Sequence, residues 1–118
     1  MILVVDDEPA IREIASCILA THGYRPLTAA EGNEALALFE QNREQVKTVV
    51  SDLMMPRMDG ATTIRSLRRM KPGLKTIMIT GLGEEGRVAE AKAAGSDLVL
   101  SKPFTAEQLL MAVKQLLG

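Results

Sequence analysis

The chain alternates short apolar runs with longer segments in which apolar residues recur at helical spacing. The short runs predict five buried strands, at residues 2–5, 25–29, 48–51, 75–80 and 98–100. The longer segments predict helices at residues 9–22, 33–42, 60–70 and 84–94, and a last helix that starts after Thr105 and keeps its apolar stripe as far as Leu117. Strands and helices therefore alternate along the whole sequence.

Local signals support several of these boundaries. Asp59 is a good N-cap for the third helix, and Thr105 with Gln108 can form a capping box at the start of the last one. Pro26 cannot donate a ladder hydrogen bond, so its strand is predicted at an edge of the sheet. The apolar stripe of the first helix comprises Ile11, Ile14, Ala15, Ile18 and Leu19.

Five strands that alternate with five helices predict an α/β fold with one parallel sheet covered by helices on both faces. If the strand with Pro26 is an edge beside the first strand, the strand order is 2-1-3-4-5. The length fits a single domain over residues 1–118, and no repeat or linker divides it.

Composition narrows the class of function. A formal net charge of -1 argues against direct nucleic-acid binding, and no apolar run approaches the length that inserts into a membrane. The sequence starts with an apolar run that ends in acidic residues, which is not typical of a signal peptide. One cysteine allows no internal disulfide. We therefore expect a cytoplasmic domain.

Polar residues stand where the predicted strands end. Asp6 and Asp7 follow the first strand, Asp52 follows the third, Thr80 ends the fourth and Lys102 follows the fifth. In open parallel sheets, ligands bind at the carboxyl ends of the strands, near the point where the strand order reverses. With the order 2-1-3-4-5, that point lies between the two strands that carry the aspartates.

Three carboxylates gathered at one point repel one another unless a cation joins them. Oxygen ligands suit a hard cation, and Mg²⁺ is the natural choice. Lys102 adds a positive charge and Thr80 a hydroxyl donor, so an anion could bind beside the metal. This combination is the electrostatic clamp that phosphoryl transfer needs.

The pattern resembles the receiver domain of two-component response regulators, over essentially the whole chain. The matching segments are Val4-Val5-Asp6-Asp7-Glu8-Pro9, Asp52-Leu53-Met54-Met55-Pro56 with Met58-Asp59-Gly60, Ile79-Thr80-Gly81 and Ser101-Lys102-Pro103-Phe104. The resemblance implies a flavodoxin-like (βα)5 fold with a doubly wound sheet. It also implies a switch in a phosphorelay rather than a conventional enzyme, with a cis bond between Lys102 and Pro103.

The resemblance also implies a role for each site residue. Asp52 would accept the phosphoryl group from a phosphohistidine, supplied by a histidine kinase or a histidine phosphotransfer domain. Asp7, Asp52 and the backbone carbonyl of Met54 would bind Mg²⁺, and Asp6 would act through a metal-bound water. Thr80 would hydrogen-bond the phosphoryl oxygens and Lys102 would pair with them.

One position departs from the family pattern. Receivers often carry Tyr or Phe three residues before the lysine, and here that residue is Val99. We expect phosphorylation to proceed, but we do not expect the usual aromatic relay to an output surface. The kinase, the signal and the output are not named by the sequence. We expect a receiver excised from a larger protein, such as a hybrid sensor histidine kinase.

Three alternatives compete with this interpretation. Residues 81–86 match G-x-G-x-x-G after a strand, but Glu84 and Glu85 would repel a pyrophosphate, which disfavours nucleotide binding. A phosphohydrolase of the haloacid dehalogenase type usually has an acid two residues after its nucleophile, where this chain has Met54. The third alternative is a receiver-like interaction module without phosphorylation, which the complete acidic set disfavours.

Other residues have structural interpretations. His22, the one histidine, falls at a predicted helix C-terminus, where the helix dipole favours a cation. Cys17 is expected to pack near the apolar stripe of the first helix. Ile11 is either core or part of an apolar patch with Ile14 and Pro103 that docks a helical phosphodonor domain.

Overall fold

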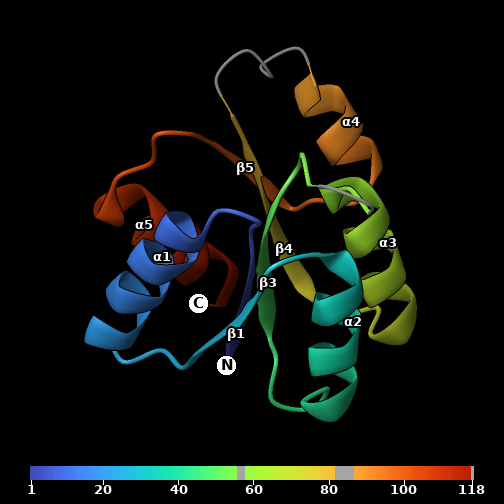
Figure 1. Cartoon of the computed structure of the whole chain (residues 1–118), viewed down its shortest axis with the longest axis horizontal. Coiled ribbons are helices and arrows are strands. Elements are labelled where there is room, and N and C mark those ends of the chain that lie inside the picture. Colours follow the sequence, from blue (N-terminus) through green and yellow to red (C-terminus); the bar gives the residue numbers. More distant parts are fainter. Residues whose placement is uncertain (56–57, 82–86, 118) are drawn as a thin grey trace.

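The computed structural model describes residues 1–55, 58–81 and 87–117 of the chain and has the predicted alternating architecture (Figure 1). The strands are β1 (Ile2–Val5), β2 (Pro26–Ala29), β3 (Thr48–Asp52), β4 (Lys75–Thr80) and β5 (Leu98–Ser101). The helices are α1 (Pro9–Thr21), α2 (Gly32–Gln41), α3 (Gly60–Met70), α4 (Val88–Ala93) and α5 (Ala106–Leu117).

All strand pairs are parallel, and the order is β2-β1-β3-β4-β5, as the sequence predicted. β2 is an edge strand, which agrees with Pro26 at its start. β1 pairs with β3 so that Val5 lies opposite Ser51. The residues that follow these two strands therefore reach the same edge of the sheet, at the point where the strand order reverses.

The sheet is covered on both faces, as Figure 1 shows. Ile2 and Val4 of β1 point to a core shared with α1 and α5. Leu3 and Val5, the alternate residues, point to a core shared with α2 and α3. A third cluster joins α3 and α4 to Met78 of β4. Because side chains on both faces of the sheet are buried, the strands are continuous apolar runs in the sequence.

The two predicted helix caps, at Asp59 and at Thr105, are confirmed. The Asp59 carboxylate accepts a hydrogen bond from the Thr62 N–H at 2.8 Å, at the start of α3. Gln108 and Thr105 exchange the two bonds of a capping box, at 2.8 and 3.0 Å. Gly60 begins α3 against β3, since a Cβ there would lie 2.2 Å from the backbone oxygen of Asp52. This glycine lets the helix start directly behind the end of β3.

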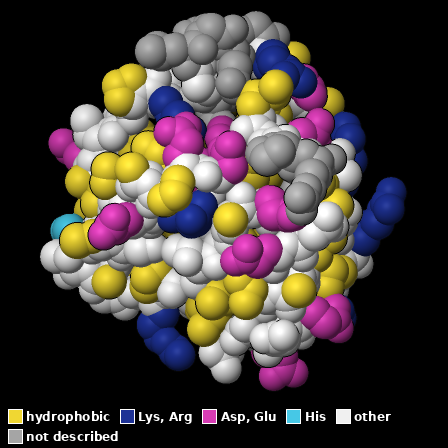
Figure 2. Space-filling view, in the orientation of Figure 1, with side chains coloured by type: hydrophobic (Ala, Val, Ile, Leu, Met, Phe, Trp, Pro, Cys, Tyr) yellow, Lys and Arg dark blue, Asp and Glu magenta, His cyan; other side chains and the backbone are white. Residues whose placement is uncertain are grey.

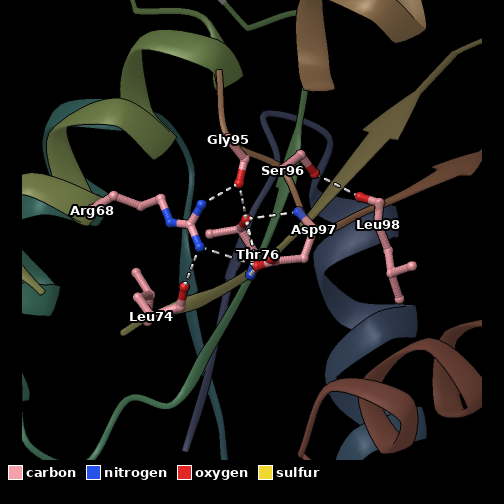
Figure 3. A network of polar contacts seen from close by, with 7 residues as sticks. All are labelled: Arg68, Leu74, Thr76, Gly95, Ser96, Asp97 and Leu98. Atoms are coloured by element: carbon pink, nitrogen blue, oxygen red, sulfur yellow. Dashed lines mark hydrogen bonds and ion pairs between the residues drawn. The ribbon is translucent and has the colours of Figure 1, made fainter. Parts of the chain in front are cut away.

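Arg68 ties α3 to the far end of β4 and to the turn before β5 (Figure 3). Its guanidinium donates to the backbone oxygens of Gly95 and Leu74, at 2.5 and 3.1 Å. It also lies 3.4 Å from Asp97, which accepts a hydrogen bond from the Thr76 N–H at 2.8 Å. Gly95 has φ +100°, a left-handed conformation that favours glycine and ends α4. The network fixes the amino ends of β4 and β5.

Several sequence predictions need correction. Ile14 and Cys17 were expected at or near the packed side of α1, but both are exposed. α1 packs through Ala15 and Leu19, and a helix turns by about 100° per residue, so positions 14 and 17 face away from the core. The fourth helix was predicted over 84–94. It is described only for Val88–Ala93, and residues 82–86 lie outside the described residues.

Among the described residues, no helix is both long enough and apolar enough to cross a bilayer.

Candidate functional site

The candidate site lies at the carboxyl edge of β1 and β3. Asp52 is the last residue of β3, and Asp6 directly follows β1. Both carboxylates are buried, while Asp7 and Glu8 are exposed beside them. One carboxylate oxygen from each of these four residues lies within 4.8 Å of the other three. The aspartates that the sequence singled out are therefore brought together, and Glu8 joins them.

Lys102 is the cation of this cluster. It follows β5, and its Nζ lies 3.3 Å from Asp6, 3.0 Å from Glu8 and 3.3 Å from Asp52. Its side chain is 16% exposed, so the ammonium is largely shielded from water. The Lys102 N–H donates to the Thr80 carbonyl at 2.7 Å, which holds the residue beside the end of β4. The bond to Pro103 is cis, as the family resemblance implied.

The burial of these charges shifts their pKa values. Burial first and the nearby Asp6 carboxylate second raise the pKa of Asp52, Lys102 opposes the rise, and the resulting pKa is about 6. Burial also raises the pKa of Asp6, against the Glu8 N–H and Lys102. Burial lowers the pKa of Lys102, but Glu8, Asp52 and Asp6 outweigh it and raise that pKa above its ordinary value. The cluster thus carries uncompensated negative charge.

One buried oxygen of this cluster is poorly satisfied. Asp6 Oδ1 accepts a hydrogen bond from the Glu8 N–H at 2.9 Å. Asp6 Oδ2 has no hydrogen-bond partner among the described residues, and the Lys102 ammonium forms an ion pair with it at 3.3 Å. A buried carboxylate oxygen in this state lacks the partner that such groups normally have. The position can therefore accept a further donor, such as a metal-bound water.

Thr80 reaches the site from the end of β4. Its hydroxyl donates to the Leu100 carbonyl at 3.4 Å, a long and therefore weak bond. Thr80 is buried, so its hydroxyl has few competing partners. A weak bond of this kind is readily exchanged for a better acceptor. Gly81, which follows it, is small and half-buried.

Met54 and Val99 lie at the borders of the site. Met54 has an exposed side chain, and its sulfur contacts the Arg87 guanidinium at the start of α4. The two oxygens of Glu90 hold that guanidinium at 2.8 and 2.9 Å. Val99 of β5 is half-buried against the cluster of α3 and α4. Through Met54, the loop after Asp52 thus contacts the residue directly before α4. Val99, where receivers often have Tyr or Phe, has no aromatic ring.

An apolar depression adjoins Lys102. It has a volume of about 210 Å³ and is lined by Ile11, Ile14, Pro103 and Phe104 as well as Lys102. Ile14 is 51% exposed and Ile11 is half-buried. The patch predicted from Ile11, Ile14 and Pro103 therefore forms a continuous surface beside the acidic cluster. Figure 2 shows acidic side chains gathered on the upper part of this face, with apolar and basic side chains directly beside them.

The sequence interpretation gave no role to two residues of the site. Glu8 is the nearest of the three carboxylates to Lys102, and the run of three acids after β1 was the signal that could have indicated it. Arg12 donates to the backbone oxygen of Asp6 at 2.6 Å and supports the turn that presents Asp6. Nothing in the local sequence pattern indicates this long side-chain contact.

Comparisons with known proteins point to one family and cover nearly the whole chain. Residues 2–114 match the family model described as the response regulator receiver domain. The chain is 39% identical over 116 residues to the sensor kinase CckA of Brucella abortus (strain 2308), covering 98% of this chain and 12% of the kinase. It is 40% identical over 116 residues to the response regulator MprA of Mycobacterium sp. (strain KMS), covering 98% of this chain and 50% of that regulator.

The solved receiver domain of NtrX from Brucella abortus superposes with a TM-score of 0.91 at 31% identity, covering 99% of this chain and 98% of that one. The fold is therefore the flavodoxin-like (βα)5 arrangement that this solved receiver domain also has. The chain spans only part of the two curated relatives named above, 12% of the length of the kinase and 50% of the length of the regulator.

Proposed function

The chain belongs to the response regulator receiver domain family, and on that premise we propose that it accepts a phosphoryl group on Asp52 in a two-component phosphorelay. The observation that carries this proposal is the buried Asp52 carboxylate, which ends β3 within 3.3 Å of the Lys102 ammonium and beside Asp6. A nucleophile, a cation and further oxygen ligands then share one edge of the sheet.

Asp52 acts as the nucleophile. One of its carboxylate oxygens forms a bond to the phosphorus of a donor phosphohistidine, and the bond between that phosphorus and the imidazole nitrogen breaks. The bonding electrons leave with the imidazole, so the donor histidine is regenerated. The carboxylate must be ionised to attack, and a pKa of about 6 leaves it ionised at neutral pH.

Lys102 and Thr80 stabilise the transferred group. Lys102 already lies beside Asp52, so its ammonium can pair with a phosphoryl oxygen after small movement of a flexible side chain. The Thr80 hydroxyl can exchange its 3.4 Å bond to the Leu100 carbonyl for a bond to a second phosphoryl oxygen. Both residues thus act on charge that develops on the phosphoryl group.

The residues present fit Mg²⁺. Their ligand atoms for a metal are all oxygens, and four carboxylates supply such atoms within 4.8 Å of one another. One of these carboxylates has an oxygen, Asp6 Oδ2, that accepts no hydrogen bond from the described residues. Asp7, Asp52 and the Met54 carbonyl would hold the ion directly, and Asp6 would hold it through water. When bound, the ion neutralises the phosphoryl oxygens and the carboxylates together.

The depression beside Lys102 suits the phosphodonor. Ile11, Ile14, Pro103 and Phe104 present apolar surface next to the nucleophile, as a helical histidine kinase or histidine phosphotransfer domain requires. A donor helix seated there would hold its phosphohistidine close to Asp52. The domain then acts as a switch, because Thr80 moves towards the phosphoryl group when that group is bound. Val99 does not follow this movement in the way that an aromatic ring would.

A phosphorylation assay with acetyl phosphate and Mg²⁺ tests this function. Wild type should gain one phosphoryl group by intact-protein mass spectrometry, and Asp52→Asn should gain none. Asp59→Asn is the matched control, because it makes the same chemical change nearby and asparagine also caps a helix. If wild type stays unmodified, the chain is an interaction module of receiver fold. If Asp52→Asn is modified as wild type is, another residue is the acceptor.

A further inference from the structure

Arg12 lies close to the amino end of α1, and its guanidinium donates to the backbone oxygen of Asp6 at 2.6 Å. Within residues 1–55, 58–81 and 87–117, the half-buried Arg12 side chain makes no other hydrogen bond and pairs with no carboxylate of the acidic cluster. The helix dipole disfavours a cation at this end of a helix. The contact with Asp6, rather than the helix itself, therefore accounts for an arginine at this position.

The oxygen that Arg12 binds belongs to the peptide unit that joins two candidate metal ligands, Asp6 and Asp7. The Asp6 N–H bonds to the Ala29 carbonyl at 3.1 Å and so continues the pairing of β1 with β2. The Asp6 carbonyl lies past the end of this pairing, and the guanidinium is its donor. Because a peptide unit is planar, a bond to this carbonyl also fixes the direction in which the chain enters Asp7.

Asp7 depends on its neighbours for its position. Its side chain is exposed and makes no hydrogen bond or ion pair in the part of the chain that the structure describes. The peptide unit before Asp7 is held by Arg12, and the one after it is held by the Glu8 N–H, which donates to Asp6 Oδ1 at 2.9 Å. Arg12 thus provides one of the two supports that set where the Asp7 carboxylate lies.

We infer that Arg12 is a positioning residue for the Mg²⁺ site, which it serves by holding the turn that presents Asp6 and Asp7. The inference rests on the function proposed above. Mg²⁺ demands nearly octahedral ligand geometry, so ligands that are held in place before binding favour its affinity. Residues that orient metal ligands typically change metal affinity by about 10- to 100-fold when they are replaced. Arg12 does this through the backbone and touches neither the ion nor the phosphoryl group.

The charge of Arg12 acts in the opposite direction. A cation near the site repels Mg²⁺, so its removal would by itself strengthen metal binding. Loss of the hydrogen bond to the Asp6 carbonyl should instead weaken metal binding, because the turn is no longer fixed. The sign of the change in Mg²⁺ affinity therefore separates a positioning role from a purely electrostatic one.

A Mg²⁺ titration of the 118-residue chain, followed by NMR at constant ionic strength, measures this affinity. Arg12→Met keeps most of the apolar stem but removes the donor, and should raise the dissociation constant about tenfold. Arg12→Lys keeps a cationic donor and should stay within about threefold of wild type. In EDTA, before any metal is added, the amide resonances of Asp7 and Glu8 should shift in Arg12→Met, because the turn has lost one support.

The rate of phosphorylation by acetyl phosphate separates positioning from chemistry. At a Mg²⁺ concentration equal to the wild-type dissociation constant, Arg12→Met should react about fivefold more slowly, which is the ratio of the metal-bound fractions when binding is about tenfold weaker. At saturating Mg²⁺ its rate should return to within about twofold of wild type, because Arg12 does not touch the reacting atoms.

Two further variants keep the test decisive. Arg69→Met removes an exposed arginine near the carboxyl end of α3, away from the site, and should change the Mg²⁺ dissociation constant less than about twofold. Arg12→Gln also removes the charge and shortens the donor, so it should behave as Arg12→Met does and replaces it if that variant does not fold.

The outcomes distinguish this inference from the proposed function. If wild type binds Mg²⁺ and is phosphorylated, but Arg12→Met binds Mg²⁺ as tightly or more tightly, the inference is wrong and the proposed function stands. If Arg12→Met remains slow at saturating Mg²⁺, Arg12 acts on the chemistry itself and the positioning role is wrong. A wild type that neither binds Mg²⁺ nor takes up a phosphoryl group overturns the proposed function, and the inference with it.

Discussion

The charge on Asp52 should make the metal-free fold less stable than the fold with a neutral residue at this position. The pKa of Asp52 rises from 3.8 to about 6, chiefly because the carboxyl is buried. The folded state therefore binds the proton of Asp52 more tightly than the unfolded state does. This contribution to stability is fully present below about pH 4 and is lost as the pH rises through about 6.

The size of the effect follows from the shift. At 1.36 kcal/mol per pKa unit, a rise from 3.8 to about 6 costs the ionised fold about 3 kcal/mol at neutral pH. Asp52→Asn removes the charge and keeps the shape, but it also removes one partner of Lys102. Since Lys102 keeps Asp6 and Glu8, we expect Asp52→Asn to stabilise the metal-free chain by roughly 2 kcal/mol at about pH 7.5. At about pH 4 the difference should be close to zero.

Urea unfolding in EDTA at these two pH values measures the difference. Glu13→Gln on the exposed side of α1 is the matched control, since it removes a surface charge and should change the free energy of unfolding by less than about 0.5 kcal/mol. Saturating Mg²⁺ should stabilise wild type, by roughly 2.7 kcal/mol at a hundred times its dissociation constant, and should affect Asp52→Asn less. If Asp52→Asn is no more stable than wild type at about pH 7.5 in EDTA, the electrostatic reasoning is wrong.

Three further predictions concern other parts of the chain. Asp7→Asn should stabilise the metal-free chain less than Asp52→Asn does, since Asp7 is exposed, and should weaken the thermal stabilisation by Mg²⁺; an unchanged Mg²⁺ response would remove Asp7 from the ligand set. Beryllofluoride with Mg²⁺ should shift the amide resonances of Thr80 and Gly81 more than that of Val99, and the reverse order would contradict the proposed switch. Arg68→Ala should lower the free energy of unfolding by about 1–3 kcal/mol, because the Gly95 and Leu74 carbonyls lose their charged donor, whereas a change below about 0.5 kcal/mol would show that water replaces the guanidinium.

The strand ends were predictable because period and polarity define them locally. An apolar run that stops at an aspartate fixes both the strand and the position of the carboxylate, as at Asp6 and Asp52. Pro26 fixed the edge strand, and with it the point where the strand order reverses. Caps such as Asp59 are also local, because the side chain bonds to the backbone three residues later.

Contacts between distant segments were not predictable in this way. The sequence placed Lys102 at the site but could not indicate that Glu8 is its nearest carboxylate, since a long side chain chooses among several partners. The Arg68 network joins segments that are separate in the sequence. Ile14 and Cys17 were misplaced because an apolar residue on a helix is compatible with either side, and only packing through Ala15 and Leu19 sets the rotation.

The central claim, that Asp52 receives the phosphoryl group, is tested most directly by chemical trapping. Phosphorylated chain is reduced with borohydride, which converts an aspartyl phosphate to homoserine, and tandem mass spectrometry then locates the converted residue. We expect homoserine at position 52, dependent on Mg²⁺ and on the phosphodonor. Homoserine at position 7 or 59 with an intact Asp52, or a phosphoryl group found on His22 or Thr80 instead, would contradict the account.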